Sequence, residues 1–284
     1  MWKRTTFRLV MPLISAPVVA WLHTKLGLRP WSWSYGAYRS RTIAHLLATY
    51  PVRVPKQPFG EWIDERVVEY PWILEQLSSL RGGRLLDAGA GLNVVEPLRV
   101  LHAQRWSVSS ITLQREAFAD PQVQYQEGDL RKLPFADGAF DAVCCVSTLE
   151  HVGMDNARYA QGCCAVRSDP GDWQVALAEM WRVTAAGGSL FVTVPCGRAA
   201  DHGWFQVFSP DLAEQVQLLL RGAQVESHYF MHRADGWLAV PPSQLATCEC
   251  WDPNGAPRTS KPRAAFSEGV LCLVARRQSL GLTE

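Results

Sequence analysis

Two histidines lie in polar loops of the sequence where they could act as general bases. His151 lies in the segment EHVGMDNARY, and His202 lies in CGRAADHGWFQVF directly after Asp201. A neutral imidazole can remove a proton from a hydroxyl near neutral pH, and an adjacent carboxylate can orient the ring or act itself. His202, His151 and Asp201 are therefore the candidate catalytic residues. For each histidine, a structural or packing role is the competing interpretation.

A glycine-containing turn lies upstream of both histidines. The segment LLDAGAGLN, residues 85–93, places Asp87 ahead of Gly89 and Gly91. Glycines at a strand-to-helix turn let the backbone approach a ligand, and the start of the following helix offers free N–H groups. Dinucleotide-binding enzymes use the same device, but their GxGxxG pattern requires a glycine where this chain has Val94. The turn predicts a ligand site, and its context decides which ligand.

The elements that must position these residues alternate between helices and strands. Apolar periodicity predicts helices at 62–80, 94–104, 173–184 and 211–220, with Gly187 and Gly188 ending the third. Short apolar runs predict strands at 85–86, 106–112, 123–128, 140–146, 189–195, 224–230 and 270–275. In open α/β sheets, ligands bind outside the carboxyl ends of the strands. The polar residues after each strand are therefore expected to meet at one edge of the sheet.

Three sequence blocks together resemble class I S-adenosylmethionine (SAM)-dependent methyltransferases. They are LLDAGAGLN, LPFADGAFDAVCCVSTLEHV and EMWRVTAAGGSLFVTVP, and the resemblance extends over roughly residues 59–277. The pattern is similar to type 11-like methyltransferases of a subgroup associated with bacterial surface-glycan and small-molecule pathways. It implies an α/β, Rossmann-like fold with a seven-stranded, mostly parallel sheet and helices on both faces. The expected domains are a basic aromatic N-terminal extension at 1–60 and a methyltransferase domain at 61–284.

The resemblance also implies SAM as the cofactor. In such a site Asp87 lies near the methionine amine, Asp129 takes the adenine amino group, and the Leu130 amide reads a ring nitrogen. The acid that usually binds the ribose is replaced by Thr112, so Gln114 or Glu116 is expected to reach the ribose. The complete expected cofactor-binding set is Asp87, Gly89, Ala90, Gly91, Asn93, Thr112, Leu113, Gln114, Asp129, Leu130, Ser147 and Glu150.

The acceptor is expected beside the loops that contain the histidines, under an insertion at 232–266 that is long enough to fold over it. The candidate substrate-binding residues are Asp155, Asn156, Arg158, Tyr159 and Trp204. Arg158 suits a carboxylate or phosphate, although a lone loop arginine is often only solvated. The predicted reaction is methyl transfer to a hydroxyl of a glycan, glycolipid or related small molecule. The alternatives are an N- or C-methyltransferase on another small metabolite, or a non-catalytic SAM-binding scaffold protein.

Charge is distributed unevenly along the 284-residue chain. The net charge is +1, but residues 1–60 contain nine Lys and Arg and no acidic residue. This segment also contains Trp31, Trp33, Tyr35 and Tyr38, a mixture typical of an anionic membrane surface. The extension is therefore predicted either to contact a membrane or to cap the active site. No nucleic-acid partner is expected because no RNA-binding module is recognised.

The apolar run at 9–22 is too short to span a bilayer, which requires about 20 apolar residues. The predicted location is cytoplasmic, with peripheral contact to the inner face of the membrane as a second expectation. Eight cysteines without a repeated CxxC pattern indicate buried thiols, and no metal site is predicted. The sequence leaves the oligomeric state open.

Overall fold

A computed structural model describes residues 33–48, 51–61, 63–115, 117–160, 166–252 and 267–278. The predictions for the apolar run at 9–22, for Glu116 and for Cys163 and Cys164 lie outside these residues. The same holds for the second part of the expected insertion, 253–266. Within the described part of the chain, no helix is both long and apolar enough to cross a membrane.

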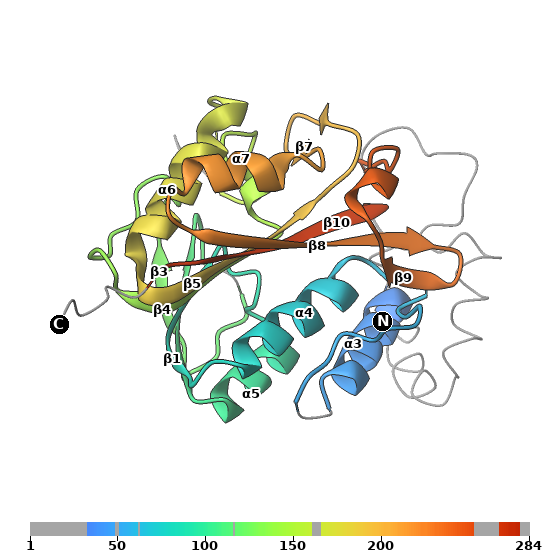
Figure 1. Cartoon of the computed structure of the whole chain (residues 1–284). Helices are drawn as coiled ribbons and strands as arrows, with labels where there is room; N and C mark the ends of the chain where they lie inside the picture. Colours follow the sequence, from blue (N-terminus) through green and yellow to red (C-terminus); the bar gives the residue numbers. More distant parts are fainter. Residues whose placement is uncertain are drawn as a thin grey trace, which may run out of the picture.

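A single large sheet runs through the centre of the molecule (Figure 1). In the described residues its eight strands follow the order β3-β2-β1-β4-β5-β10-β8-β9. The first five in that order pair in parallel: β1 (Gly83–Ala88), β2 (Trp106–Thr112), β3 (Gln124–Glu127), β4 (Phe140–Val146) and β5 (Thr184–Pro195). Strand β10 (Gly269–Arg276) is antiparallel to both of its neighbours, β5 and β8 (Gln224–Arg233).

Helices cover both faces of this sheet. Figure 1 shows α6 (Trp173–Val183) and α7 (Leu212–Leu219) on one face, and α3 (Trp33–Leu46), α4 (Arg66–Ser78) and α5 (Val95–Ala103) on the other. Apart from Asp141, the sequence of β4 is apolar because both of its faces are buried. Val143 and Cys145 join the core under α6, whereas Cys144 and Val146 join the core under α4. The predicted layered α/β fold is confirmed.

Within the described residues the sheet has eight strands, one more than predicted. After β8 the chain turns back and forms β9 (Gly236–Ala239), which pairs antiparallel with β8 and lies at the sheet edge. The first part of the expected insertion is therefore sheet. Helix α6 also ends earlier than predicted, at Val183, and Gly187 and Gly188 lie within β5.

Short elements lie in the loops that follow the strands, including the two loops that contain His151 and His202. Single 3-10 turns form at Leu149–His151, Pro170–Asp172 and Pro242–Gln244. A small ribbon of β6 (Ala200–Asp201) and β7 (Gln206–Val207) lies in the loop after β5. The backbone N–H of Asp155 donates to the carbonyl of Gly203 at 2.9 Å, so the two loops contact each other.

The central position of β10 generates a stability prediction. Leu271 is fully buried in the core under α6 and α7, so Leu271→Ala is expected to lower the free energy of unfolding by about 2–5 kcal/mol. Leu218 on α7 is 75% exposed, and Leu218→Ala is the control with an expected change within about 0.5 kcal/mol. Urea denaturation measures both, and equal losses would contradict this description of the core.

Candidate functional site

A cavity of about 340 Å³ lies at the carboxyl ends of β1, β2, β3 and β4. Twelve of the residues predicted to form a site line it together. They are Gly89, Ala90, Gly91, Asn93, Thr112, Leu113, Asp129, Leu130, Ser147, His151, Asn156 and Tyr159.

The glycine turn after β1 forms the floor of this cavity. Gly89 has a φ of +102°, and a Cβ atom there would lie 2.2 Å from the Thr148 side chain. A Cβ atom on Gly91 would lie 2.6 Å from the carbonyl oxygen of Val146. Both carboxylate oxygens of buried Asp87 accept from the N–H of Leu92 at 3.1 Å. The two glycines therefore let the turn pack tightly against the residues at the end of β4, and Asp87 holds the turn in shape.

Comparison with known proteins identifies this part of the chain. Residues 86–192 match the family model described as "Methyltransferase domain". This stretch is similar to a methyltransferase domain. It contains the glycine turn and the ends of all the strands that surround the cavity. The match agrees with the methyltransferase resemblance that implied SAM as the cofactor.

Two curated relatives match parts of the chain. The ubiquinone biosynthesis O-methyltransferase of Bordetella bronchiseptica is 33% identical over 113 residues, which is 36% of this chain and 45% of the relative. The demethylmenaquinone methyltransferase of Deinococcus radiodurans is 39% identical over 69 residues, which is 24% of this chain and 21% of the relative. The chain therefore spans less than half the length of these two relatives.

A solved structure shares the fold more completely. The cyclase SpnF superposes with a TM-score of 0.50 at 19% identity, covering 89% of this chain and 98% of the other. The name of that protein shows that this fold also hosts reactions other than methyl transfer. The reaction must therefore be argued from the site of the methyltransferase domain and not from its fold alone.

The residues present fit the cofactor of the family. The glycine turn provides close backbone approach, and both Asp129 and Leu130 line the cavity where the resemblance places adenine. Thr112 also lines the cavity, whereas Gln114 is exposed and is not among the lining residues. Of the two residues expected to reach the ribose in place of an acid, only Gln114 is described, and it lies outside the cavity.

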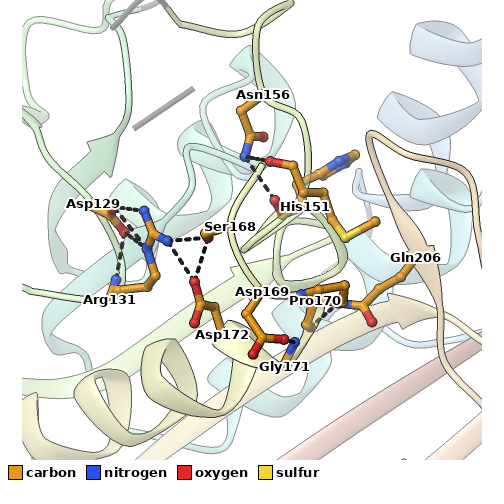
Figure 2. Close-up of polar contacts among 11 residues, drawn as sticks. Asp129, Arg131, His151, Asn156, Ser168, Asp169, Pro170, Gly171, Asp172 and Gln206 are labelled. Atoms are coloured by element: carbon orange, nitrogen blue, oxygen red, sulfur yellow. Dashed lines mark hydrogen bonds and ion pairs between the residues drawn. The ribbon is translucent and has the colours of Figure 1, made fainter. Parts of the chain in front are cut away.

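A single arginine fixes Asp129 in the methyltransferase domain (Figure 2). Arg131 donates through Nε and Nη2 to both carboxylate oxygens of Asp129, at 2.6–3.1 Å. Its Nη1 donates to Ser168 and Asp172, each at 2.7 Å. Burial raises the pKa of Asp129, but the hydrogen bonds and charge of Arg131 outweigh it, so the net pKa is lowered. Asp129 is thus an oriented carboxylate, tied to the segment that precedes α6.

His151 faces the cavity in a defined orientation. Its Nδ1 lies 2.8 Å from the carbonyl oxygen of Trp204. Because a carbonyl only accepts, Nδ1 must carry the proton, and Nε2 of the neutral ring keeps its lone pair. Asn156 supports the loop by donating from Nδ2 to the carbonyls of His151 and Met154 at 2.9 and 3.1 Å (Figure 2).

Three other predicted residues surround His151. Trp204 stacks on the His151 ring with centroids 5.3 Å apart. The Arg158 guanidinium lies over the Trp204 ring, 3.7 Å from its centroid. Glu150 is buried, and its Oε1 lies 3.9 Å from His151 Nε2. None of Trp204, Arg158 and Glu150 is among the described residues that line the cavity, and neither is Asp155.

The second candidate base lies elsewhere. The His202 ring stacks on Phe205 at 4.5 Å, and Asp201 pairs with Arg167 and accepts from the N–H of Gly203. Neither His202 nor Asp201 is among the described residues that line the cavity. The Asp201 carboxylate therefore bonds to Arg167 and to the Gly203 N–H, and no hydrogen bond to the His202 ring is found in the described chain.

Sequence reasoning missed the residues that α3 and α4 contribute. Arg39, Arg66 and Tyr70 line the cavity, and buried Glu69 connects Arg66 to the ends of β4 and β5. Glu69 Oε1 accepts from Ser147 at 2.6 Å and from Thr193 at 2.7 Å, and Oε2 accepts from Arg66 at 2.6 Å. The sequence feature that could have indicated them is the four charged residues at 64–69, next to the apolar residues of α4.

Among the described residues, no group of three or more His, Cys, Asp or Glu is placed to hold a metal.

The Arg131 contacts generate a binding prediction. Arg131→Met removes the fork that orients Asp129, so binding of S-adenosylhomocysteine (SAH) is expected to weaken about tenfold. Arg276→Met is the matched control, because Arg276 pairs with Glu226 at 2.7 Å on β10 and β8, outside the cavity. Isothermal titration calorimetry compares the two variants, and equal affinities would remove Arg131 from the cofactor site.

Proposed function

We propose that this chain is a SAM-dependent methyltransferase that transfers a methyl group to a hydroxyl of a small-molecule acceptor, with His151 as the base. The supporting observation is the contact between His151 Nδ1 and the Trp204 carbonyl, which leaves Nε2 available as a proton acceptor at the cavity wall. Oxygen as the methylated atom agrees with the name of the Bordetella relative, of which this chain covers 45%.

The family's cofactor supplies an electrophilic methyl group, and the protein has to align the acceptor, exclude water and remove a proton. Gly89, Gly91, Asp129 and Leu130 would hold the cofactor, because they border the cavity on the glycine-turn side. Asn156, Tyr159 and His151 border it on the side of the loop after β4. The acceptor hydroxyl is thus expected between these two groups of residues.

The environment of His151 keeps its ring neutral. Burial lowers its pKa to about 4, with the charges of Arg66 and Arg158 acting in the same direction and the Trp204 carbonyl opposing them. At neutral pH the ring is therefore ready to accept a proton. Burial also raises the pKa of Glu150 well above its usual value. A proton on His151 favours the ionised form of Glu150, which gives the imidazolium a neighbouring negative charge.

The glycan or glycolipid acceptor, the membrane contact and the cytoplasmic location stay predictions from the sequence. The described part of the N-terminal extension supports its second expected role, that of an active-site cap, because Arg39 of α3 lines the cavity. An acceptor-dependent formation of SAH from SAM tests the proposed function. Cofactor binding without turnover across a broad panel of hydroxyl, amine and carbon acceptors would favour the scaffold alternative.

The base assignment is tested by substitution. His151→Gln is expected to lower kcat by about 100- to 10,000-fold, because the hydroxyl loses its proton acceptor, while SAH affinity is retained. His202→Gln is measured alongside. A loss of kcat at His202, with normal turnover in the His151 variant, would transfer the role of base to His202.

The pH profile provides a second test. Since the pKa of His151 is lowered to about 4, its neutral form persists from high pH down to that value. We therefore expect kcat to stay level between about pH 6 and 8 and to fall only in more acidic solution. A kcat that halves near pH 6.5, the ordinary value for histidine, would show that the base is a more exposed imidazole.

A further inference from the structure

We propose that Arg66 and Tyr70, flanked by Arg39, form a carboxylate-binding subsite, and that the acceptor is an aromatic hydroxy acid. This inference rests on the proposed function and names the substrate class of the same cavity. Helices α3 and α4 present hydrogen-bond donors to the cavity.

The Arg66 guanidinium has unused hydrogen-bond donors. Its Nη1 donates to Glu69 at 2.6 Å, whereas Nε and Nη2 make no hydrogen bond within the described part of the chain. The side chain lines the cavity and is about one-fifth exposed. Glu69 is fixed in turn by Ser147 and Thr193, so the guanidinium is held in place. A held guanidinium with two unused N–H directions matches the planar oxygen pair of a carboxylate.

Tyr70 provides the second donor. The residue is only 2% exposed, its side chain lines the cavity, and its hydroxyl has no hydrogen-bond partner among the described residues. Because Tyr70 lines the cavity and its hydroxyl donor is unused within the described chain, a ligand atom can accept its hydrogen bond. Arg39 flanks this pair: its Nε contacts the Asp64 carboxylate at 2.7–2.8 Å, and its side chain also lines the cavity.

The local charge balance permits an anion here. Arg39 pairs with the Asp64 carboxylate, and Arg66 pairs with the Glu69 carboxylate. Two further acids lie nearby, but burial raises the pKa of Glu65 to about 8 and that of Glu150 well above its usual range. Burial therefore disfavours a negative charge on Glu65 and Glu150, which weakens their repulsion of an acceptor carboxylate.

The position of Arg66 relates the subsite to the base. Arg66, His151 and Tyr159 line the same cavity, Arg66 from α4 and the other two from the loop after β4. An acceptor anchored by its carboxylate at Arg66 would therefore present a hydroxyl to His151 Nε2. The rings of His151 and Tyr159, 5.2 Å apart between centroids, provide an aromatic surface against which a flat ring packs.

A matched pair of probes tests the proposal by calorimetry on the SAH-loaded protein. We expect 3,4-dihydroxybenzoate to bind at least about tenfold more tightly than 3,4-dihydroxybenzamide, which has no charge. Arg66→Gln, which retains a donor for Glu69, and Tyr70→Phe should both reduce this ratio. Arg84→Gln, at the opposite end of β1 and 60% exposed, should preserve it. Equal affinities for the two probes, or an unchanged ratio in both variants, would overturn the proposal.

A second titration distinguishes the two carboxylates that could occupy the subsite, that of the acceptor and that of the cofactor's amino-acid portion. Methylthioadenosine lacks the amino-acid portion of SAH, so the two ligands are titrated into the wild type and Arg66→Gln. If the variant loses affinity for SAH alone, Arg66 binds the cofactor carboxylate and the acceptor assignment is wrong. Retained SAH affinity together with a reduced probe ratio supports the assignment. Failure of the wild type to bind SAH would refute the proposed function itself.

Discussion

Glu69 is the buried charge on which the architecture of the site depends. A carboxylate without solvent must be paired and fully hydrogen-bonded, and Glu69 meets this requirement with Arg66, Ser147 and Thr193. These partners come from α4 and from the ends of β4 and β5, so one side chain joins a helix to two central strands. Satisfying the carboxylate therefore sets the position of the α4 arginine relative to the rim of the cavity. Removal of any one partner would leave a buried charge under-compensated.

The layered fold was largely predictable because its signals are local. Strands β2 and β4 were predicted with their observed bounds, since an apolar run between turns is typical of a strand buried on both faces. Strand β9 was missed because its pairing depends on a hairpin inside a segment without clear periodicity. The early start of β5 was missed because the strand begins at Thr184, before the glycines that usually mark such a boundary.

The candidate site was predictable only where its parts follow strand ends. The glycine turn, Asp129 and His151 each follow a predicted strand, and all reach the cavity. The contact between Glu69 and Ser147 joins residues 78 positions apart, and no local pattern indicates such a pairing. Two histidines in similar polar loops looked alike in the sequence, yet packing brings only His151 into the cavity lining of the described chain.

Trp237 has a consequence for how the chain could be recombined. Its fully buried indole donates to the carbonyl of Ile63 at 2.9 Å, and its backbone pairs with Phe59 in both directions. The segment before α4 and the β8–β9 hairpin therefore form one packing unit, although they flank the family match at residues 86–192 on opposite sides. An exchange of that central stretch between relatives would leave this unit whole. Grafting either flank alone would divide it, so the two flanks are expected to be inherited as one module.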